Sequence, residues 1–176
     1  MSDRNRSYRG ARDGFTLVEL LIVVIILAIL AAIVVPQFIA STDDAREAAV
    51  DTNLRNMRAA IDLYYQQHNE YPSANGDGVN AAGTNLAFIS QMTQFTDNDG
   101  DVAATKNVAT GHIYGPYLRR SSLPADPIKN VSTLVIVPVA SEGTLPVPAD
   151  AGDPGGWKFD KIAGQIILNH ASYADR

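Results

Sequence analysis

The side chains that most often carry enzyme chemistry are scattered in this sequence. The three histidines stand far apart and lack the spacing of metal ligands: His68, His112 and His170. The absence of cysteine excludes disulfide bonds and thiolate metal sites. The sequence contains no phosphate-binding loop, dinucleotide fingerprint or recognisable Ser-His-Asp arrangement. We therefore expect the protein not to be an enzyme.

One short segment has the composition of a metal-binding loop. Residues 97–101 read Asp-Asn-Asp-Gly-Asp. An EF-hand loop has a glycine at its sixth position and a glutamate at its twelfth. Counted from Asp97, this sequence has neither. A solvated acidic turn is the interpretation that we favour for this segment.

One carboxylate stands in a place where charges are rare. Glu19 lies near the start of an apolar segment, residues 15–35. Such a segment can cross a lipid bilayer as a helix, which takes about 20 residues. A carboxylate inside a membrane span costs about 2.5–3.5 kcal/mol on insertion scales. Glu19 therefore needs either a positively charged partner or a position at the membrane edge beside the headgroups.

The segment before the apolar run predicts its orientation. Residues 1–14 are polar and contain four arginines. Positive charge favours the cytoplasmic side, so we expect everything after Pro36 to lie across the membrane. A secretory signal peptide is the alternative, because residues 28–32 are mostly small. However, no cleavage site is placed to remove the apolar segment cleanly.

A single long helix is the element that must position these residues. Beyond the apolar run, large apolar side chains recur at spacings of four and three, which predicts one buried helix face: Val50, Leu54, Met57, Ile61 and Tyr64. We expect a helix over residues 15–68, apolar all round at first and amphipathic later. Pro36 should kink it, because proline cannot donate the helical hydrogen bond.

The rest of the chain predicts a small sheet. Residues 133–139 are β-branched and bounded by turn residues, as in a strand. Residues 157–160 and 165–169 read as a hairpin in which Gly164 supplies a positive φ. The expected fold class is α+β: a long N-terminal helix packed on a small C-terminal antiparallel β-sheet. The net charge of −5 argues against nucleic acid as the main partner.

The first third of the chain resembles the type IV pilin family, which includes type IV pilus subunits and the pseudopilins of type II secretion. The resemblance rests on Gly14, on Phe15 after it, on Glu19 as the fifth residue beyond the glycine, and on Pro36 after the apolar run. It implies that prepilin peptidase cuts between Gly14 and Phe15 and methylates the new amine of Phe15. A glycine at the cut permits close approach of the enzyme to the backbone.

The resemblance also implies roles for Glu19 and Pro36. Glu19 would pair with the N-terminal amine of a neighbouring subunit in a filament, which would offset the cost of a buried carboxylate. The position beside lipid headgroups is the alternative for this residue. Pro36 matches a proline near which the helix loosens on assembly, and a tolerated kink is its alternative.

The resemblance further implies four parts of the chain: a cleaved leader at 1–14, a transmembrane and filament-core helix at 15–36, the amphipathic half of the helix at 37–72, and a loop region with the C-terminal sheet at 73–176. Major pseudopilins commonly hold calcium in a C-terminal loop. No cofactor is otherwise expected, and the carboxylates that could serve as calcium ligands here are Asp126, Asp150, Asp153 and Asp160.

The expected function is that of a structural filament subunit in the bacterial cytoplasmic membrane, with its C-terminal domain outside the cytoplasm. Its implied partners are further copies of the chain through the N-terminal helix, prepilin peptidase, minor pilins or pseudopilins, an inner-membrane assembly platform and membrane lipid. A type II secretion pseudopilin is favoured, because residues 123–127 and 155–160 are similar to elements of the major pseudopilins. The alternatives are a type IV pilus subunit and a membrane-anchored binding domain that does not polymerise.

Overall fold

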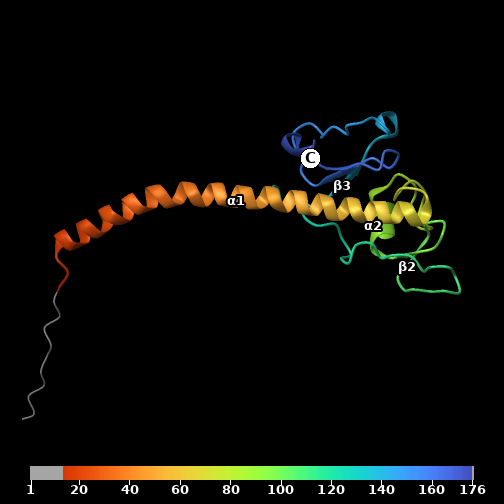
Figure 1. Cartoon of the computed structure of the whole chain (residues 1–176), viewed down its shortest axis with the longest axis horizontal. Coiled ribbons are helices and arrows are strands. Elements are labelled where there is room, and N and C mark those ends of the chain that lie inside the picture. The colour runs from red at the N-terminus through yellow and green to blue at the C-terminus, as the bar shows by residue number, and fades with distance from the viewer. Residues whose placement is uncertain (1–13, 176) are drawn as a thin grey trace, which may run out of the picture. The chain divides into compact units, whose positions relative to one another are not determined.

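Figure 1 shows a computed structural model of the chain, which describes residues 14–175. The residues divide into two compact units, one ending at Asp43 and the other beginning at Asp44. The long helix α1, Leu17–His68, contributes to both units. The expected leader, apart from Gly14, lies outside the described residues.

The first unit consists of the apolar part of α1. Its large apolar side chains, from Leu17 to Ile39, are between 45% and 84% exposed. The helix is long and apolar enough to cross a membrane, and its most apolar window has a mean hydropathy of 3.4. Pro36 lies inside α1, which continues on both sides of it. The expected long helix is confirmed, whereas a loosening at Pro36 stays a prediction.

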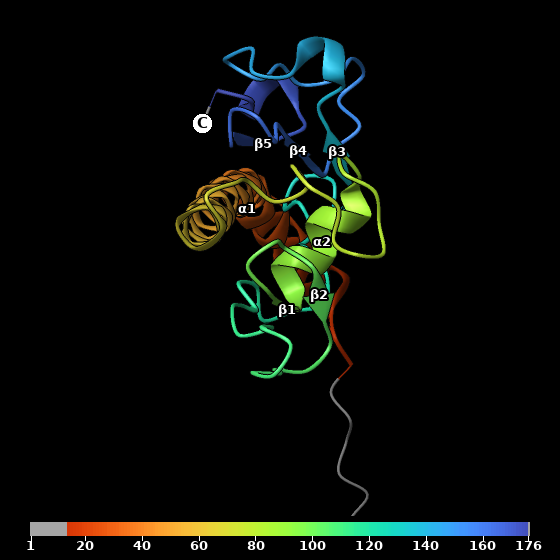
Figure 2. The same ribbon diagram turned by 90° about the vertical axis from the view of Figure 1, so that its right-hand side faces the viewer.

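The second unit is built on the amphipathic part of α1. The predicted stripe is buried, with every side chain at most 3% exposed: Val50, Leu54, Met57, Ile61 and Tyr64. In Figure 2 the later part of α1 lies at one side of this unit, with the other elements of the unit packed against that helix from the other side. Trp157, Phe159 and Phe88 complete the same core, in which the rings of Phe88 and Phe159 lie 4.8 Å apart.

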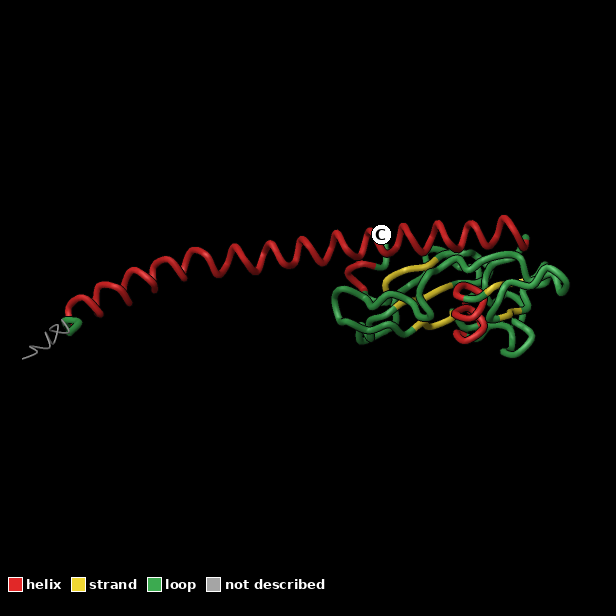
Figure 3. Tube along the Cα trace, turned by 90° about the horizontal axis from the view of Figure 1, so that it is seen from below, coloured by secondary structure: helices red, strands yellow, loops and turns green. Residues whose placement is uncertain are grey.

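Two small sheets and one short helix make up the rest of this unit, which Figure 3 shows to be mostly loop. Helix α2, Asn85–Thr93, is capped by Thr84, whose side chain accepts a hydrogen bond from the amide of Ala87. Strands β1, Phe95–Thr96, and β2, Val102–Ala103, pair antiparallel. They fall in a region with no strand pattern, and their pairing was not expected from the sequence.

The second sheet has the order β3-β4-β5, with strands Leu134–Ile136, Trp157–Phe159 and Ile166–Leu168. Strands β4 and β5 form the predicted antiparallel hairpin, and Gly164 has φ +70°. The α+β class is therefore confirmed.

The pairing of β3 corrects the expected sheet, because β3 runs parallel to β4. Parallel neighbours need a crossover of a dozen or more residues, and residues 137–156 supply it. Two side chains of this crossover, Val137 and Val147, pack on Ile167 of β5 and form a second small core. The crossover thus covers the face of the sheet that α1 does not. Short 3₁₀ turns at Val139–Ser141 and Ala171–Tyr173 complete the chain.

Candidate functional site: the start of the long helix and the C-terminal loop

The start of α1 is closed by a reciprocal set of hydrogen bonds between Thr16 and Glu19. The backbone amide of Thr16 donates to Glu19 Oε2 at 2.9 Å, and the Thr16 hydroxyl donates to the same oxygen at 2.7 Å. The amide of Glu19 donates in return to Thr16 Oγ1 at 3.2 Å. The carbonyl of Thr16 accepts the first helical bond, from Leu20. This arrangement is a capping box, which satisfies two amides that a helix start leaves unpaired.

The capping box gives Glu19 a role inside its own subunit. A negative charge here also faces the positive end of the helix dipole. All of the bonds from Thr16 use Oε2, so Oε1 takes no part in the box. The capping role of Thr16 was not predicted from the sequence, although Thr-x-x-Glu before an apolar run is a recognised signature of this cap.

Gly14 and Phe15 lie just before this helix start and are both exposed. A Cβ built on Gly14 meets no atom within 4 Å. The fold itself therefore places no steric demand for glycine at position 14. Phe15 is 76% exposed. The peptide bond between these two residues is consequently accessible to another protein.

The four carboxylates considered as calcium ligands are held by the protein's own donors. Asp126 Oδ1 accepts hydrogen bonds from the amides of Ile128 and Lys129, and its Oδ2 accepts one from Gly156 at 3.0 Å. Asp160 is bonded in the same manner to the amides of Ile162, Ala163 and Gly143. Both are almost fully buried. These two carboxylates stabilise turns.

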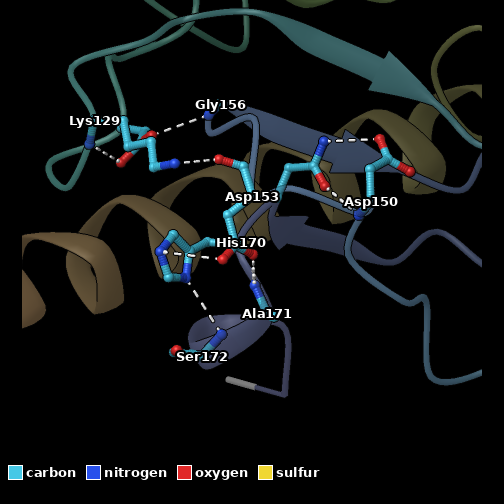
Figure 4. Close-up of polar contacts among 9 residues, drawn as sticks. Lys129, Asp150, Asp153, Gly156, His170, Ala171 and Ser172 are labelled. Atoms are coloured by element: carbon cyan, nitrogen blue, oxygen red, sulfur yellow. Dashed lines mark hydrogen bonds and ion pairs between the residues drawn. The ribbon is translucent and has the colours of Figure 1, made fainter.

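The other two carboxylates, Asp150 and Asp153, have separate partners (Figure 4). Asp150 accepts hydrogen bonds from the Lys158 ammonium group at 2.6 Å and from the Asn169 amide group at 3.0 Å. The bond from Lys158 holds the pKa of Asp150 below its usual value, against an opposing effect of desolvation. Asp153 Oδ1 accepts from the amide of Ala171 at 2.6 Å.

Two lysine ammonium groups donate hydrogen bonds to backbone carbonyl oxygens of the loop at residues 137–156. Lys158 Nζ donates to the carbonyl of Pro148 at 2.8 Å as well as to Asp150. Lys129 Nζ donates to the carbonyl of Asp153. Among residues 14–175, no group of three or more His, Cys, Asp or Glu side chains is placed to hold a metal ion. The residues present do not fit a calcium site, because ammonium groups bind the oxygens that a cation would need.

We expect the loop to depend on Lys158 and not on calcium. Substitution of Lys158 by Met should destabilise the chain by about 1–3 kcal/mol, since it leaves the Pro148 carbonyl and the Asp150 carboxylate without the ammonium group that binds them. For a chain of this size, each kcal/mol lowers the melting temperature by about 2–4 °C. A thermal melt of the full chain in detergent measures this effect, with the exposed Lys106→Met as a control.

The same melt tests the metal directly. A chelator should leave the melting temperature of the wild-type chain unchanged, and added calcium should not raise it. Because the pKa of Asp150 is lowered, the contribution of its pair with Lys158 should be present at neutral pH. It should be lost in acid, at values below the usual aspartate pKa of about 3.9. Stabilisation of the wild-type chain by calcium would contradict the lysine-based account.

Comparisons with known proteins agree with the geometry of the helix start. The family profile described as "Prokaryotic N-terminal methylation motif" matches residues 9–35. Type II secretion system core protein G of Klebsiella michiganensis is 28% identical over 159 residues, which cover 87% of this chain and 98% of that protein. Core protein G of Pseudomonas aeruginosa is 42% identical over 65 residues, and the match covers 37% of this chain and 46% of that protein.

A third relative is a pilus protein. The type IV narrow pilus major component PilA5 of Thermus thermophilus is 40% identical over 90 residues, which cover 48% of this chain and 78% of that protein. No solved structure matches the chain. The chain belongs to the family of type IV pilins and type II secretion pseudopilins.

Proposed function

We propose that this chain is the precursor of a type II secretion pseudopilin, a structural subunit of a pilus-like filament anchored in the bacterial cytoplasmic membrane. The observation that carries the proposal is the exposure of the apolar side chains in the first part of α1. Its large apolar side chains are all exposed, although the second part of the same helix has a buried stripe. An exposed apolar surface of this length needs lipid or other helices around it.

Membrane lipid would cover this surface before assembly, and the helices of neighbouring subunits would cover it in the filament. In the membrane, hydrocarbon surrounds the apolar part of α1, whose helical conformation pairs most of its backbone groups internally, as a span requires. In the filament, the same parts of neighbouring copies pack together. A subunit therefore keeps its apolar surface covered in both states. The partners in this process are prepilin peptidase, other pseudopilins and the inner-membrane assembly platform.

We propose cleavage between Gly14 and Phe15, followed by methylation of the Phe15 amine. The exposure of both residues supports this step, since an accessible bond is what a peptidase requires. The family profile that matches residues 9–35 is that of the methylation motif. After cleavage, the new N-terminus would lie four residues before Glu19, beside the capping box.

We further propose that Glu19 binds the N-terminal amine of a neighbouring subunit. The carboxylate has one oxygen in the capping box and the other outside it. It can therefore keep its local bonds to Thr16 while Oε1 accepts a hydrogen bond from a second chain. A pair of opposite charges with additional hydrogen bonds is the arrangement that makes a buried charge tolerable.

The length of the matches supports a pseudopilin over a pilus subunit. Core protein G of Klebsiella michiganensis matches 87% of this chain, so the match extends well beyond the long helix. The match to the Thermus pilus component covers 48% of the chain. That match still favours a type IV pilus subunit as the second candidate, since the shared N-terminal segment serves both kinds of filament.

Deletion of the gene in the bacterium that encodes it separates these two candidates. For a major pseudopilin, we expect the secreted proteins to accumulate in the periplasm by at least tenfold, with surface pili retained. Complementation with the intact gene should restore secretion. Measurement of exoproteins in the medium and electron microscopy of the cell surface provide the two readings. Loss of pili with normal secretion would support the pilus subunit instead.

A further inference from the structure

The C-terminal end of α1 contains a histidine whose two ring nitrogens both contact carbonyl oxygens. His68 Nδ1 lies 3.0 Å from the carbonyl oxygen of Tyr64, one helical turn earlier. His68 Nε2 lies 2.9 Å from the carbonyl oxygen of Asp97, in the turn that follows β1. Both distances are those of good hydrogen bonds. The imidazole thus joins the last turn of the helix to the turn at 97–101.

The partners determine the protonation state of the ring. A carbonyl oxygen carries no hydrogen and can only accept. A neutral imidazole has one N–H, so it can donate to one of the two carbonyls and must present a lone pair to the other. Only the imidazolium ion, with two N–H groups, makes both bonds.

The surroundings of the ring suit a cation. His68 stacks on the face of Tyr64, with ring centroids 4.0 Å apart and planes at 11°. A cation over an aromatic face within about 6 Å is attracted to it. The rings of Tyr114 and Tyr117 stand edge-on at 5.3 Å and 6.1 Å. The ring also lies at the end of α1, where the helix dipole is negative.

The charged groups around the ring are acidic. A small polar pocket of about 150 Å³ is lined by His68 together with Glu70 and Asp99. The carboxylate of Asp97 is fixed by the amides of Asp99 and Asp101. The pKa of Tyr64 is raised, first by burial and then by Tyr117, Glu70, Asp97 and Asp77.

The remaining titratable groups near the ring are phenols. Burial, above all, raises the pKa of Tyr117 to about 12, so this side chain stays neutral at physiological pH. Tyr71 also lines the pocket, and burial raises its pKa. The titratable groups that face His68 are therefore neutral phenols and carboxylates: Tyr64, Glu70, Tyr71, Asp97, Asp99, Tyr114 and Tyr117.

We propose that His68 is an imidazolium ion in the folded subunit and serves as a pH-sensitive clamp between the end of α1 and the turn at 97–101. Loss of one proton turns a lone pair toward a carbonyl oxygen and breaks one of the two bonds. Gly100 lies in the same turn, where a Cβ would come within 2.8 Å of the Tyr64 hydroxyl. Release of the turn would therefore loosen its packing on the helix end. The proposal does not depend on the function proposed above.

Nitrogen-15 NMR of the full chain in detergent micelles at pH 7 tests the charge state. Both ring nitrogens of His68 should show the chemical shifts and attached protons of an imidazolium. His170 is the internal control, because its Nδ1 accepts a hydrogen bond from the amide of Ser172 and must therefore be unprotonated. A spectrum in which His68 is neutral, like His170, would overturn the proposal.

Thermal melts of wild type and His68→Gln test the clamp itself. Glutamine keeps one amide donor group but does not titrate. The wild type should exceed the variant in melting temperature by several degrees at pH 6, and the difference should shrink on going to pH 9. The half-buried His112 gives a control, since its ring contacts the Thr110 hydroxyl and does not join two backbone carbonyls. His112→Gln should show no such trend. A difference that stays constant over this range would refute the clamp, and the NMR result decides the charge state if the variant does not fold.

Discussion

Substitution of Gly14 by Trp should leave the precursor uncut. Because nothing lies within 4 Å of a Cβ at this position, the variant should fold and insert like the wild type. The effect should arise only in the peptidase, whose approach to the backbone the indole would block. Intact-mass spectrometry of the membrane-extracted protein measures this. The wild type should lack residues 1–14 and carry one extra methyl group. Almost all molecules of the variant should keep the whole leader.

A second glycine of the leader provides the control for this experiment. Gly10 lies four residues before Gly14, so Gly10→Trp adds the same side chain away from the proposed cut. This variant should be processed. Normal cleavage of Gly14→Trp would contradict the proposed cleavage site. An uncut Gly10→Trp would show that the peptidase requires more of the leader than its last residue.

Substitution of Glu19 by Ala should abolish filament assembly and leave membrane insertion intact. The proposed partner is the N-terminal amine of a neighbouring subunit. Removal of one member of a buried, hydrogen-bonded charge pair costs about 3–5 kcal/mol. Since each 1.4 kcal/mol is a factor of ten, the yield of filaments should fall by about 100-fold or more. Sheared filaments and membrane fractions, quantified side by side, give the two readings.

The capping box makes a sharper comparison possible. Glu19→Gln keeps an oxygen that can accept from Thr16, as glutamine does in natural capping boxes, but it removes the charge. Thr16→Val removes both hydrogen bonds of the Thr16 hydroxyl and keeps the charge of Glu19. If the charge is what matters, Glu19→Gln should fail like Glu19→Ala, and Thr16→Val should assemble better than both. Assembly of Glu19→Gln at the wild-type level would reduce the role of this carboxylate to capping.

The elements that could be predicted from the sequence are those with a strong periodic pattern. The stripe from Val50 to Tyr64 was predicted to be buried and is buried. An amphipathic helix buries its apolar face against the core of the domain. The β4–β5 hairpin was predicted as well, since Gly164 marks its turn. Local sequence carries both of these signals.

The features that could not be predicted depend on contacts between distant residues. The parallel pairing of β3 with β4 follows from the path of residues 137–156, which no local pattern specifies. Lysines on other segments donate to this region: Lys158 binds the carboxylate of Asp150, and Lys129 binds the backbone carbonyl of Asp153. A list of carboxylates in a sequence does not tell whether a metal or an ammonium group will neutralise them.

The position of β4 and β5 late in the chain also has a consequence for the order in which the chain can fold. The apolar stripe of α1 is made early in synthesis, but its cover includes β4 and β5, near the other end of the chain. Contacts so far apart in sequence form slowly, and the uncovered stripe is prone to aggregation in the meantime. Under the proposed topology, the C-terminal strands reach the helix only after they have crossed the bilayer. An anchored N-terminus would then hold each unfinished subunit apart from the others, at the membrane, until its last strand arrives.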